Sequence, residues 1–331
     1  MNQQVPISSL IPGENIIAFY LVKQVKRKVA KNGNPYIFVE LGDRFGAIDG
    51  RKFGMEPAEV EGLAPGVIVK VAASVDEFND KTNLNISKIR VATEAETLQH
   101  QGALVRSSAE APEVILSKIR EELIEPLKEA FQFEYLLLDW MVRGVSESQL
   151  LQAPAASRLH HAYIGGLLEH ILSLGRMSIY ASFHYSLDRG TMTALAMLHD
   201  WGKLLELANT NGAIEYTRAG HLFGHIAMGY ATTGQWVQSV TPKALEAGVD
   251  LLAIRQRTEA ILHGILSHHG ELEHGSPVRP ATREAIAFHH IDNLDSRMAM
   301  EAEAWEREAA DSDITAERHW SLGVRLLRFK K

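Results

Sequence analysis

The sequence contains no cysteine, and its longest apolar run is short. Without cysteine the chain cannot form disulfides, use a thiol nucleophile, or hold iron–sulfur clusters or zinc fingers through thiolates. The longest apolar run, Ile16–Val22, is far below the roughly 20 residues that cross a bilayer. Residues 1–15 also lack a charged start followed by an apolar stretch, so no signal peptide is expected. These absences favour a cytoplasmic protein without a membrane partner.

Positive charge is also scarce, because 34 Lys and Arg stand against 41 Asp and Glu, for a net charge of −7. A globally acidic chain does not favour nucleic-acid binding, so any such function needs a local basic patch. The composition is otherwise that of a globular protein, with 46% apolar and 23% charged residues. The 331 residues are enough for about two domains.

The N-terminal residues 1–92 are typical of a small β-domain, in which β-forming runs are separated by turn signals such as Asn32-Gly-Asn-Pro35. We expect five strands, with one short helix over 56–62 between the third and the fourth. The strands are 16–29, 36–41, 47–53, 66–73 and 84–91. This order predicts an OB-fold, a five-stranded Greek-key barrel, with an SH3-like barrel as the alternative.

The remainder of the chain is typical of an all-α domain. Residues 93–113 are rich in Ala, Glu, Gln and Ser and predict a partly helical linker, in which His100 is expected to face solvent. From Val114 onward apolar residues recur at helical spacing almost to the end. We therefore expect an all-β OB-fold domain over 1–92, a linker over 93–113 and an all-α domain over 114–331.

Histidine is abundant, and 13 of the 15 histidines lie between His160 and His290. Histidine is the commonest metal ligand and a frequent acid–base group. His199 and Asp200 are adjacent in an apolar helical stretch, where a buried carboxylate is costly unless it is paired or bound to metal. Adjacent helical side chains point about 100° apart, so one of the pair could bind one ion while the other bridges to a second.

Further histidines and carboxylates add to this pair. His221 and His225 are spaced i, i+4 and would share a face of a helix. The adjacent His268 and His269 diverge, and Asp292 lies on a later predicted helix. Imidazoles and carboxylates without thiolate suit Mn²⁺, Fe²⁺, Co²⁺, Ni²⁺ or Zn²⁺. Such sites support metal-assisted hydrolysis when coordination positions are open.

These motifs resemble a known family. The order His170, His199-Asp200 and Asp292 resembles the HD superfamily of metal-dependent phosphohydrolases, whose domain is all-α. Longer motifs resemble the YhaM-type 3′–5′ exoribonucleases, in which an OB-fold precedes the HD domain. They are Gly165-Gly-Leu-Leu-Glu-His170, His199-Asp-Trp-Gly-Lys203, Leu266-Ser-His-His-Gly270 and Ile291-Asp-Asn-Leu-Asp295. The resemblance extends over both expected domains.

The resemblance implies two divalent transition-metal ions, with Mn²⁺ favoured over Co²⁺, Fe²⁺, Ni²⁺ or Zn²⁺. It implies four core ligands, among which Asp200 bridges the ions, and two more ligands for the second ion. The core ligands are His170, His199, Asp200 and Asp292, and the further two are His225 and His268.

The resemblance also implies roles around the ions. His199, Asp200 and Lys203 would carry catalysis, with the Lys203 ammonium on the scissile phosphate; the alternative for Lys203 is a solvated lysine at a helix end. Four further residues are assigned to the substrate side, and support of the ligands remains an open alternative for the two adjacent histidines among them. The four are Arg158, His160, His161 and His269.

A local basic patch near the N-terminus offers a nucleic-acid surface. Residues 1–54 hold eight basic and four acidic side chains, a local net charge of +4. OB-folds use the loop after the first strand for oligonucleotides, and outward-facing aromatic rings there can stack on bases. The candidate contacts are Lys26, Arg27, Lys28, Lys31 and Tyr36. The alternatives are a solvated hairpin for the lysines and the barrel core for Tyr36 and Phe38, which share a face by strand alternation.

The favoured function is metal-dependent 3′–5′ hydrolysis of single-stranded RNA to 5′-mononucleotides. Single-stranded DNA as a second substrate and assembly into a homo-oligomer are left open. A second interpretation is a phosphohydrolase of free nucleotides or cyclic dinucleotides, which would not need a strand-binding barrel. A third is a non-catalytic nucleic-acid-binding protein, which would be expected to lack one of the core ligands.

Overall fold

The computed structural model divides into two compact units, and each is described by itself. One unit comprises Met1–Ser107 with Asn209–Ile214, and the other comprises Ser108–Ala208 with Glu215–Lys331. The residues described are 5–30, 33–44, 46–54, 61–78, 81–157, 161–306, 308 and 311–329. Residues 56–60 of the helix 56–62 expected from the sequence lie outside them.

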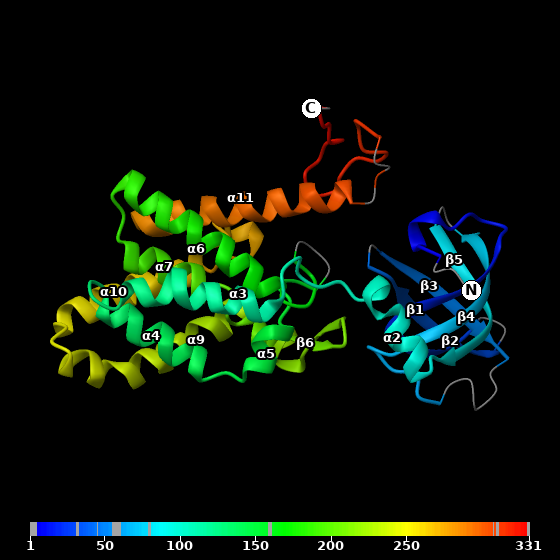
Figure 1. Cartoon of the computed structure of the whole chain (residues 1–331), viewed down its shortest axis with the longest axis horizontal. Coiled ribbons are helices and arrows are strands. Elements are labelled where there is room, and N and C mark those ends of the chain that lie inside the picture. Colours follow the sequence, from blue (N-terminus) through cyan, green and yellow to red (C-terminus); the bar gives the residue numbers. More distant parts are fainter. Residues whose placement is uncertain are drawn as a thin grey trace. The chain divides into compact units, whose positions relative to one another are not determined.

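The first unit is a closed five-stranded barrel (Figure 1). Its strands are β1 (Asn15–Val29), β2 (Pro35–Gly42), β3 (Ala47–Phe53), β4 (Ile68–Phe78) and β5 (Lys81–Val91). They follow the order β1-β2-β3-β5-β4, and β4 pairs back with β1 to close the barrel. The β3–β5 pair is parallel and the others are antiparallel. This is the strand order of an OB-fold, so the expected fold is confirmed and the SH3-like alternative is excluded.

Alternation along the strands fills the barrel. Ile37, Val39 and Leu41 of β2 are buried, and they pack with apolar residues of the other strands to form the barrel core. The segment after the barrel holds α2 (Glu94–Leu104), which begins with a Thr93 capping box. His100 on α2 is buried and its ring stacks on Phe19 at 4.1 Å. The expectation that His100 faces solvent was therefore wrong, because α2 packs against the outside of β1.

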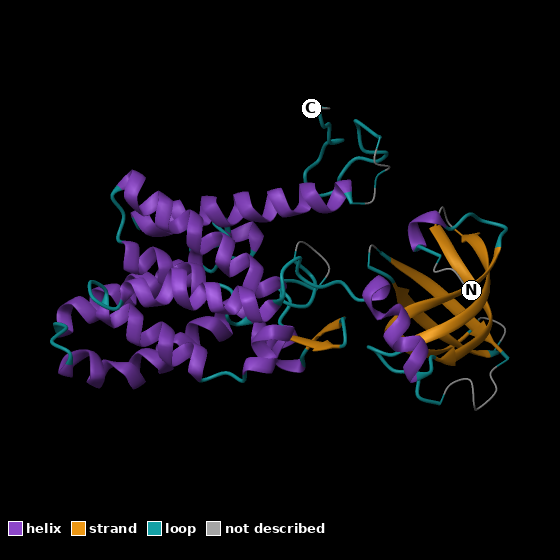
Figure 2. Cartoon of the chain, viewed as in Figure 1, coloured by secondary structure: helices purple, strands orange, loops and turns teal. Residues whose placement is uncertain are grey.

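The second unit is mainly helical (Figure 2), and it holds only the outer ends of a short hairpin whose residues Asn209–Ile214 belong to the first unit. Its first half holds α3 (Pro112–Lys118), a π-helical segment (Ile119–Ile124), a 3₁₀ turn (Glu125–Leu127), α4 (Gln132–Arg143), α5 (Glu147–Gln152), α6 (Gly166–Tyr185), α7 (Arg189–Leu198) and α8 (Lys203–Glu206). The hairpin of β6 (Leu207–Thr210) and β7 (Ala213–Tyr216) follows. The last helices are α9 (Arg218–Glu246), α10 (Leu251–Ser267) and α11 (Arg283–Trp305). The expected all-α class holds for this part, and the sequence reasoning missed the hairpin.

Helix α7 forms the centre of this unit. Its residues from Gly190 to Leu198 are all buried, and α6, α10 and α11 pack around it. Gly264 of α10 makes one of these approaches possible, since a Cβ there would lie 2.3 Å from Leu195. A helix that is apolar on nearly all sides is typical of the centre of a helical domain. No helix within the described ranges is long and apolar enough to span a bilayer.

Candidate metal centre

His199 and Asp200 directly follow the buried C-terminal end of α7 and lie in the interior of the helical unit. Both side chains are buried, and His170 from α6 and Asp292 from α11 meet them there. The His170 Nε2 atom lies 3.3 Å from His199 Nε2 and 3.3 Å from an Asp292 oxygen. The Asp200 Oδ2 atom lies 3.3 Å from His199 Nε2. The structure thus brings together the four residues expected as core ligands.

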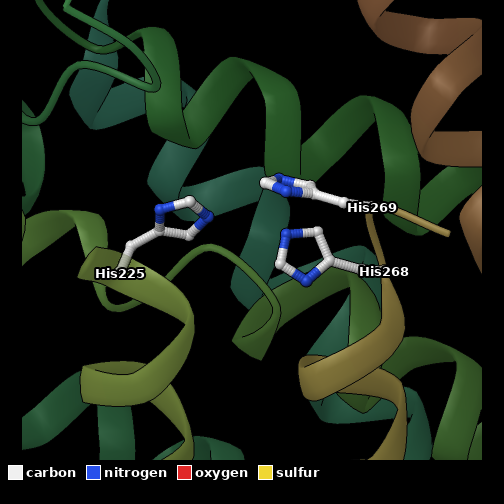
Figure 3. A group of neighbouring side chains, drawn as sticks. All are labelled: His225, His268 and His269. Atoms are coloured by element: carbon white, nitrogen blue, oxygen red, sulfur yellow. The ribbon is translucent and has the colours of Figure 1, made fainter. Parts of the chain in front are cut away.

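A second group of imidazoles lies on the other side of Asp200. His225 Nε2 is 3.4 Å and His268 Nε2 is 3.7 Å from Asp200 Oδ1. His269 completes a group of three rings that turn toward one another (Figure 3). His225 reaches this point because Gly224 (φ 70°, ψ 159°) interrupts α9 directly before it.

Three polar atoms at this point are buried without a hydrogen-bond partner among the described residues. They are Asp200 Oδ1, His225 Nε2 and His268 Nε2. Each unpaired buried polar group costs about 1–3 kcal/mol, so three facing one another call for a bound group. The two oxygens of Asp200 face different imidazoles, Oδ2 toward His199 and Oδ1 toward His225 and His268. The donor set therefore fits divalent metal ions.

The proton positions on the histidines fit the same conclusion. In three of them the Nδ1 atom faces a backbone carbonyl, which only accepts hydrogen bonds, so Nδ1 carries the proton. The pairs are His199 with Leu195 at 3.1 Å, His268 with Ile265 at 2.8 Å and His269 with His274 at 2.9 Å. In the neutral imidazole the Nε2 lone pair is then free for a cation.

Carboxylates hold the other two imidazoles in the same way. Asp295 Oδ2 accepts from His170 Nδ1 at 2.8 Å, and its second oxygen accepts from the Ser173 hydroxyl. Glu206 Oε1 lies 3.2 Å from His225 Nδ1 and accepts from the His225 backbone N–H at 3.0 Å. A carboxylate behind a ligating histidine fixes its tautomer and raises its basicity. The sequence reasoning assigned no role to Asp295 or Glu206.

Burial and charged neighbours shift the pKa values of the ionisable groups at the centre. Burial disfavours the charged form of Asp200, but the Lys203 ammonium 2.5 Å away and His199 hold the pKa of Asp200 well below its usual range. Burial alone would lower the pKa of His170, but hydrogen bonds to Asp292 and Asp295 outweigh it and raise this pKa to about 9. Burial and neighbouring imidazoles lower the pKa of His268 far below its usual value, which keeps it neutral.

A cavity of about 480 Å³ is lined by residues from both clusters. Asp200, Lys203, His225, His268, His269 and Asp292 all contribute to its surface. Its volume falls within the range of small-molecule sites. Lys203 and His269 therefore lie where a ligand of the metal centre would bind.

Curated relatives resemble the chain over nearly its whole length. The 3′–5′ exoribonuclease YhaM of Geobacillus sp. (strain WCH70) is 30% identical over 298 residues, which cover 89% of this chain and 86% of the relative. The enzyme of the same name from Bacillus subtilis (strain 168) is 30% identical over 296 residues, 89% of each chain. This chain belongs to the YhaM family. The family resemblance expected from the motifs is confirmed.

The other comparisons add nothing to this family assignment. No family model matches it. A solved OB-fold domain of replication protein A from Methanococcus maripaludis is 22% identical and covers 28% of this chain and 97% of its own, with a TM-score of 0.24. The assignment of the barrel rests on its own strand order instead.

The predicted substrate-side residues of this YhaM-family chain fall into three groups. His269 lines the cavity. His161 is buried, with a φ of 56°, and its Nε2 atom lies 3.5 Å from Asp295, so it sits behind His170. Its Nδ1 atom is 2.9 Å from the Tyr163 hydroxyl. The other two, Arg158 and His160, lie outside the described residues, as does the barrel candidate Lys31.

The outer face of the barrel carries aromatic rings with nearby lysines. Tyr36 stacks on Phe53 at 5.1 Å, and 45% of the Phe53 surface is exposed. Lys28 Nζ lies 4.2 Å from the centre of the Phe38 ring. Lys26 and Lys28 pair across the strands with Phe38 and Tyr36, and these side chains therefore share one face. These aromatic residues point away from the barrel core.

The third basic candidate on this strand lies on the opposite side of the ribbon. Arg27 is exposed near the end of β1, where it pairs with the buried Ile37. Side chains alternate along a strand, so Arg27 points away from the face that holds Lys26 and Lys28.

Proposed function

We propose that this chain is a metal-dependent 3′–5′ exoribonuclease that shortens single-stranded RNA and releases 5′-mononucleotides. The observation that carries the proposal is the position of Asp200, with Oδ2 facing His199 and Oδ1 facing His225 and His268. A carboxylate placed between two imidazole clusters suits a pair of divalent ions, and such pairs act on phosphodiesters. Membership of a family in which two relatives are named 3′–5′ exoribonucleases supports the direction and the substrate class.

The residues that would hold the ions follow from the two clusters. His170, His199 and Asp292 would hold one ion and His225 and His268 the other, and Asp200 would bridge them. The absence of thiolates favours Mn²⁺, with Co²⁺, Fe²⁺, Ni²⁺ and Zn²⁺ as alternatives. When bound, such ions lower the pKa of water and stabilise charge on phosphate oxygens.

Lys203 would provide the protein's own cation for the phosphate. Its ammonium lines the cavity and pairs with Asp200 Oδ2 at 2.5 Å, so it is held in place before a substrate enters. A fixed positive charge in a partly buried site stabilises charge that develops on a phosphate oxygen. His199 and Asp200 would orient the reacting groups around it.

The barrel would hold the body of the RNA. Its outer face combines the stacked Tyr36 and Phe53 rings with Lys26 and Lys28. Aromatic platforms beside basic side chains bind single strands without regard to sequence, and the binding weakens with salt. Such tolerance suits an enzyme that must degrade any RNA.

The test is hydrolysis of 5′-labelled single-stranded RNA with Mn²⁺ or with EDTA. A ladder that shortens from the 3′ end only with metal, and that is absent in Asp200→Asn, is the expected result. The matched control is Asp139→Asn, because Asp139 pairs with Arg143 on α4 away from the centre. RNA that stays intact with every metal refutes the proposal. Turnover of nucleotides or cyclic dinucleotides would then identify a phosphohydrolase, and RNA binding without turnover a non-catalytic protein.

A further inference from the structure

The cavity at the metal centre is also lined by apolar side chains that the chemistry above does not use. Leu207, Tyr216 and Met300 line the same cavity as Asp200 and Lys203. Tyr216 is the last residue of β7, and 45% of its surface is exposed. Single exposed aromatic residues are common on proteins, so the significance of Tyr216 comes from its place in this cavity.

Neighbouring side chains hold the Tyr216 ring in position. The His221 ring lies 5.2 Å away at a tilt of 36°, and the Ser157 hydroxyl lies 3.5 Å from the Tyr216 hydroxyl. A ring that is already positioned loses little conformational entropy when it binds a ligand. Tyr216 therefore presents a pre-organised aromatic surface to the cavity.

The polar residues of the cavity indicate which kind of ligand would contact the Tyr216 ring. A phosphodiester bound at Lys203 and the imidazole–carboxylate centre would bring the sugar and base of the same nucleotide into the same cavity. We propose that Tyr216 stacks on the base of the 3′-terminal nucleotide. The cavity is then a nucleotide-binding site, with Lys203 at the phosphate and Tyr216 at the base. Stacking does not depend on base identity, because every base has a π-face. The proposal rests on the proposed exoribonuclease function and adds the base contact.

The test compares two RNAs that differ only at the 3′ end, where one carries adenosine and the other a ribose without a base. The unsubstituted protein is expected to prefer the adenosine end in kcat/KM by about 5- to 150-fold, the range for loss of one stacked base. Tyr216→Ala should abolish this preference, and Tyr216→Phe should keep it. The control Tyr230→Ala should also keep it, since Tyr230 is 41% exposed but lies on α9 outside the cavity lining.

The outcomes separate this proposal from the proposed function. A preference that persists in Tyr216→Ala, or that is absent in the unsubstituted protein, overturns the stacking while the exoribonuclease stands. If neither RNA is shortened, the exoribonuclease fails, and binding of 5′-AMP and ribose 5-phosphate with Mn²⁺ decides the stacking. Tighter binding of 5′-AMP that Tyr216→Ala removes supports it, and equal affinities for the two ligands overturn it.

Discussion

Asp295→Asn removes one negative charge from behind the metal centre while preserving its shape. Asp295 accepts from His170 Nδ1 at 2.8 Å and, through its other oxygen, from the Ser173 hydroxyl. In the variant the amide oxygen can still accept from His170, and the amide nitrogen can donate to the Ser173 oxygen. The His170 tautomer therefore survives, and the change isolates the effect of the carboxylate charge.

The loss in metal affinity follows from the hydrogen bond that changes. A hydrogen bond to a charged group contributes about 1.5–3 kcal/mol and a neutral one about 0.5–1.5, so the variant loses about 1–1.5 kcal/mol. This corresponds to about tenfold weaker binding, at the lower end of the 10- to 100-fold range for partners of ligating histidines. Calorimetric titration of the metal-free protein with Mn²⁺ measures it. Mn²⁺ binding at the proposed site of His170 should weaken, and binding at the proposed site of His225 and His268 should change less.

The control for this experiment is Asp139→Asn, which also removes one negative charge but lies on α4 in an ion pair with Arg143. It should leave both Mn²⁺ affinities unchanged. Equal affinities in Asp295→Asn and the unsubstituted protein would refute the reasoning about His170. Equal loss of Mn²⁺ affinity at both sites would show that the Asp295 charge acts through the overall electrostatic potential of the helical unit rather than through the His170 ring.

Two further predictions concern stability and RNA binding. Burial raises the pKa of Glu134 to about 7 despite its pairing with Arg257, so the folded chain binds a proton more tightly than the unfolded one. The protonated Glu134 carboxyl contributes its full share to the free energy of unfolding below about pH 4.5. This contribution, at most about 3 kcal/mol, is lost as the pH rises to 7. When the free energy of unfolding is measured with denaturant across this range, it should depend less on pH in Glu134→Gln than in the unsubstituted protein. Identical pH dependence in the two proteins would contradict the raised pKa of Glu134. On the barrel, Phe53→Ala should weaken single-stranded RNA binding about 5- to 150-fold in anisotropy titrations with EDTA. Ile17→Ala, an exposed apolar change elsewhere on the barrel, should not, and an equal effect of both would exclude the aromatic face.

The barrel was predictable from its strands, but the direction of its aromatic residues was not. Alternation establishes that Tyr36 and Phe38 share a face, yet their neighbours Ile37 and Val39 are equally apolar. A strand with two apolar faces has no sequence signal for which of them is inside. The choice depends on closure of the barrel, in which Ile37 and Val39 of β2 face the core while Tyr36 lies outside it and stacks on Phe53.

Spacing along the chain identified residues that the fold brings together, but not the residues that hold them. His221 and His225 were expected to share a helical face, and Gly224 breaks the helix between them, so that only His225 faces Asp200. Asp295 follows Asp292 by three positions on α11, a spacing that places both on one face. This spacing is visible in the sequence. Its meaning depends on the fold, in which the His170 ring lies between the two carboxylates.

The arrangement that makes the centre suitable for metal also makes it unfavourable without metal. Asp200 Oδ1, His225 Nε2 and His268 Nε2 are buried without partners, and at about 1–3 kcal/mol each they destabilise the metal-free fold by several kcal/mol. The apolar packing of α7 stabilises the fold against this cost. A ligand that binds only the folded state stabilises it by mass action and so offsets this cost. The unpaired atoms are therefore better explained by selection for binding than by selection for stability of the free chain.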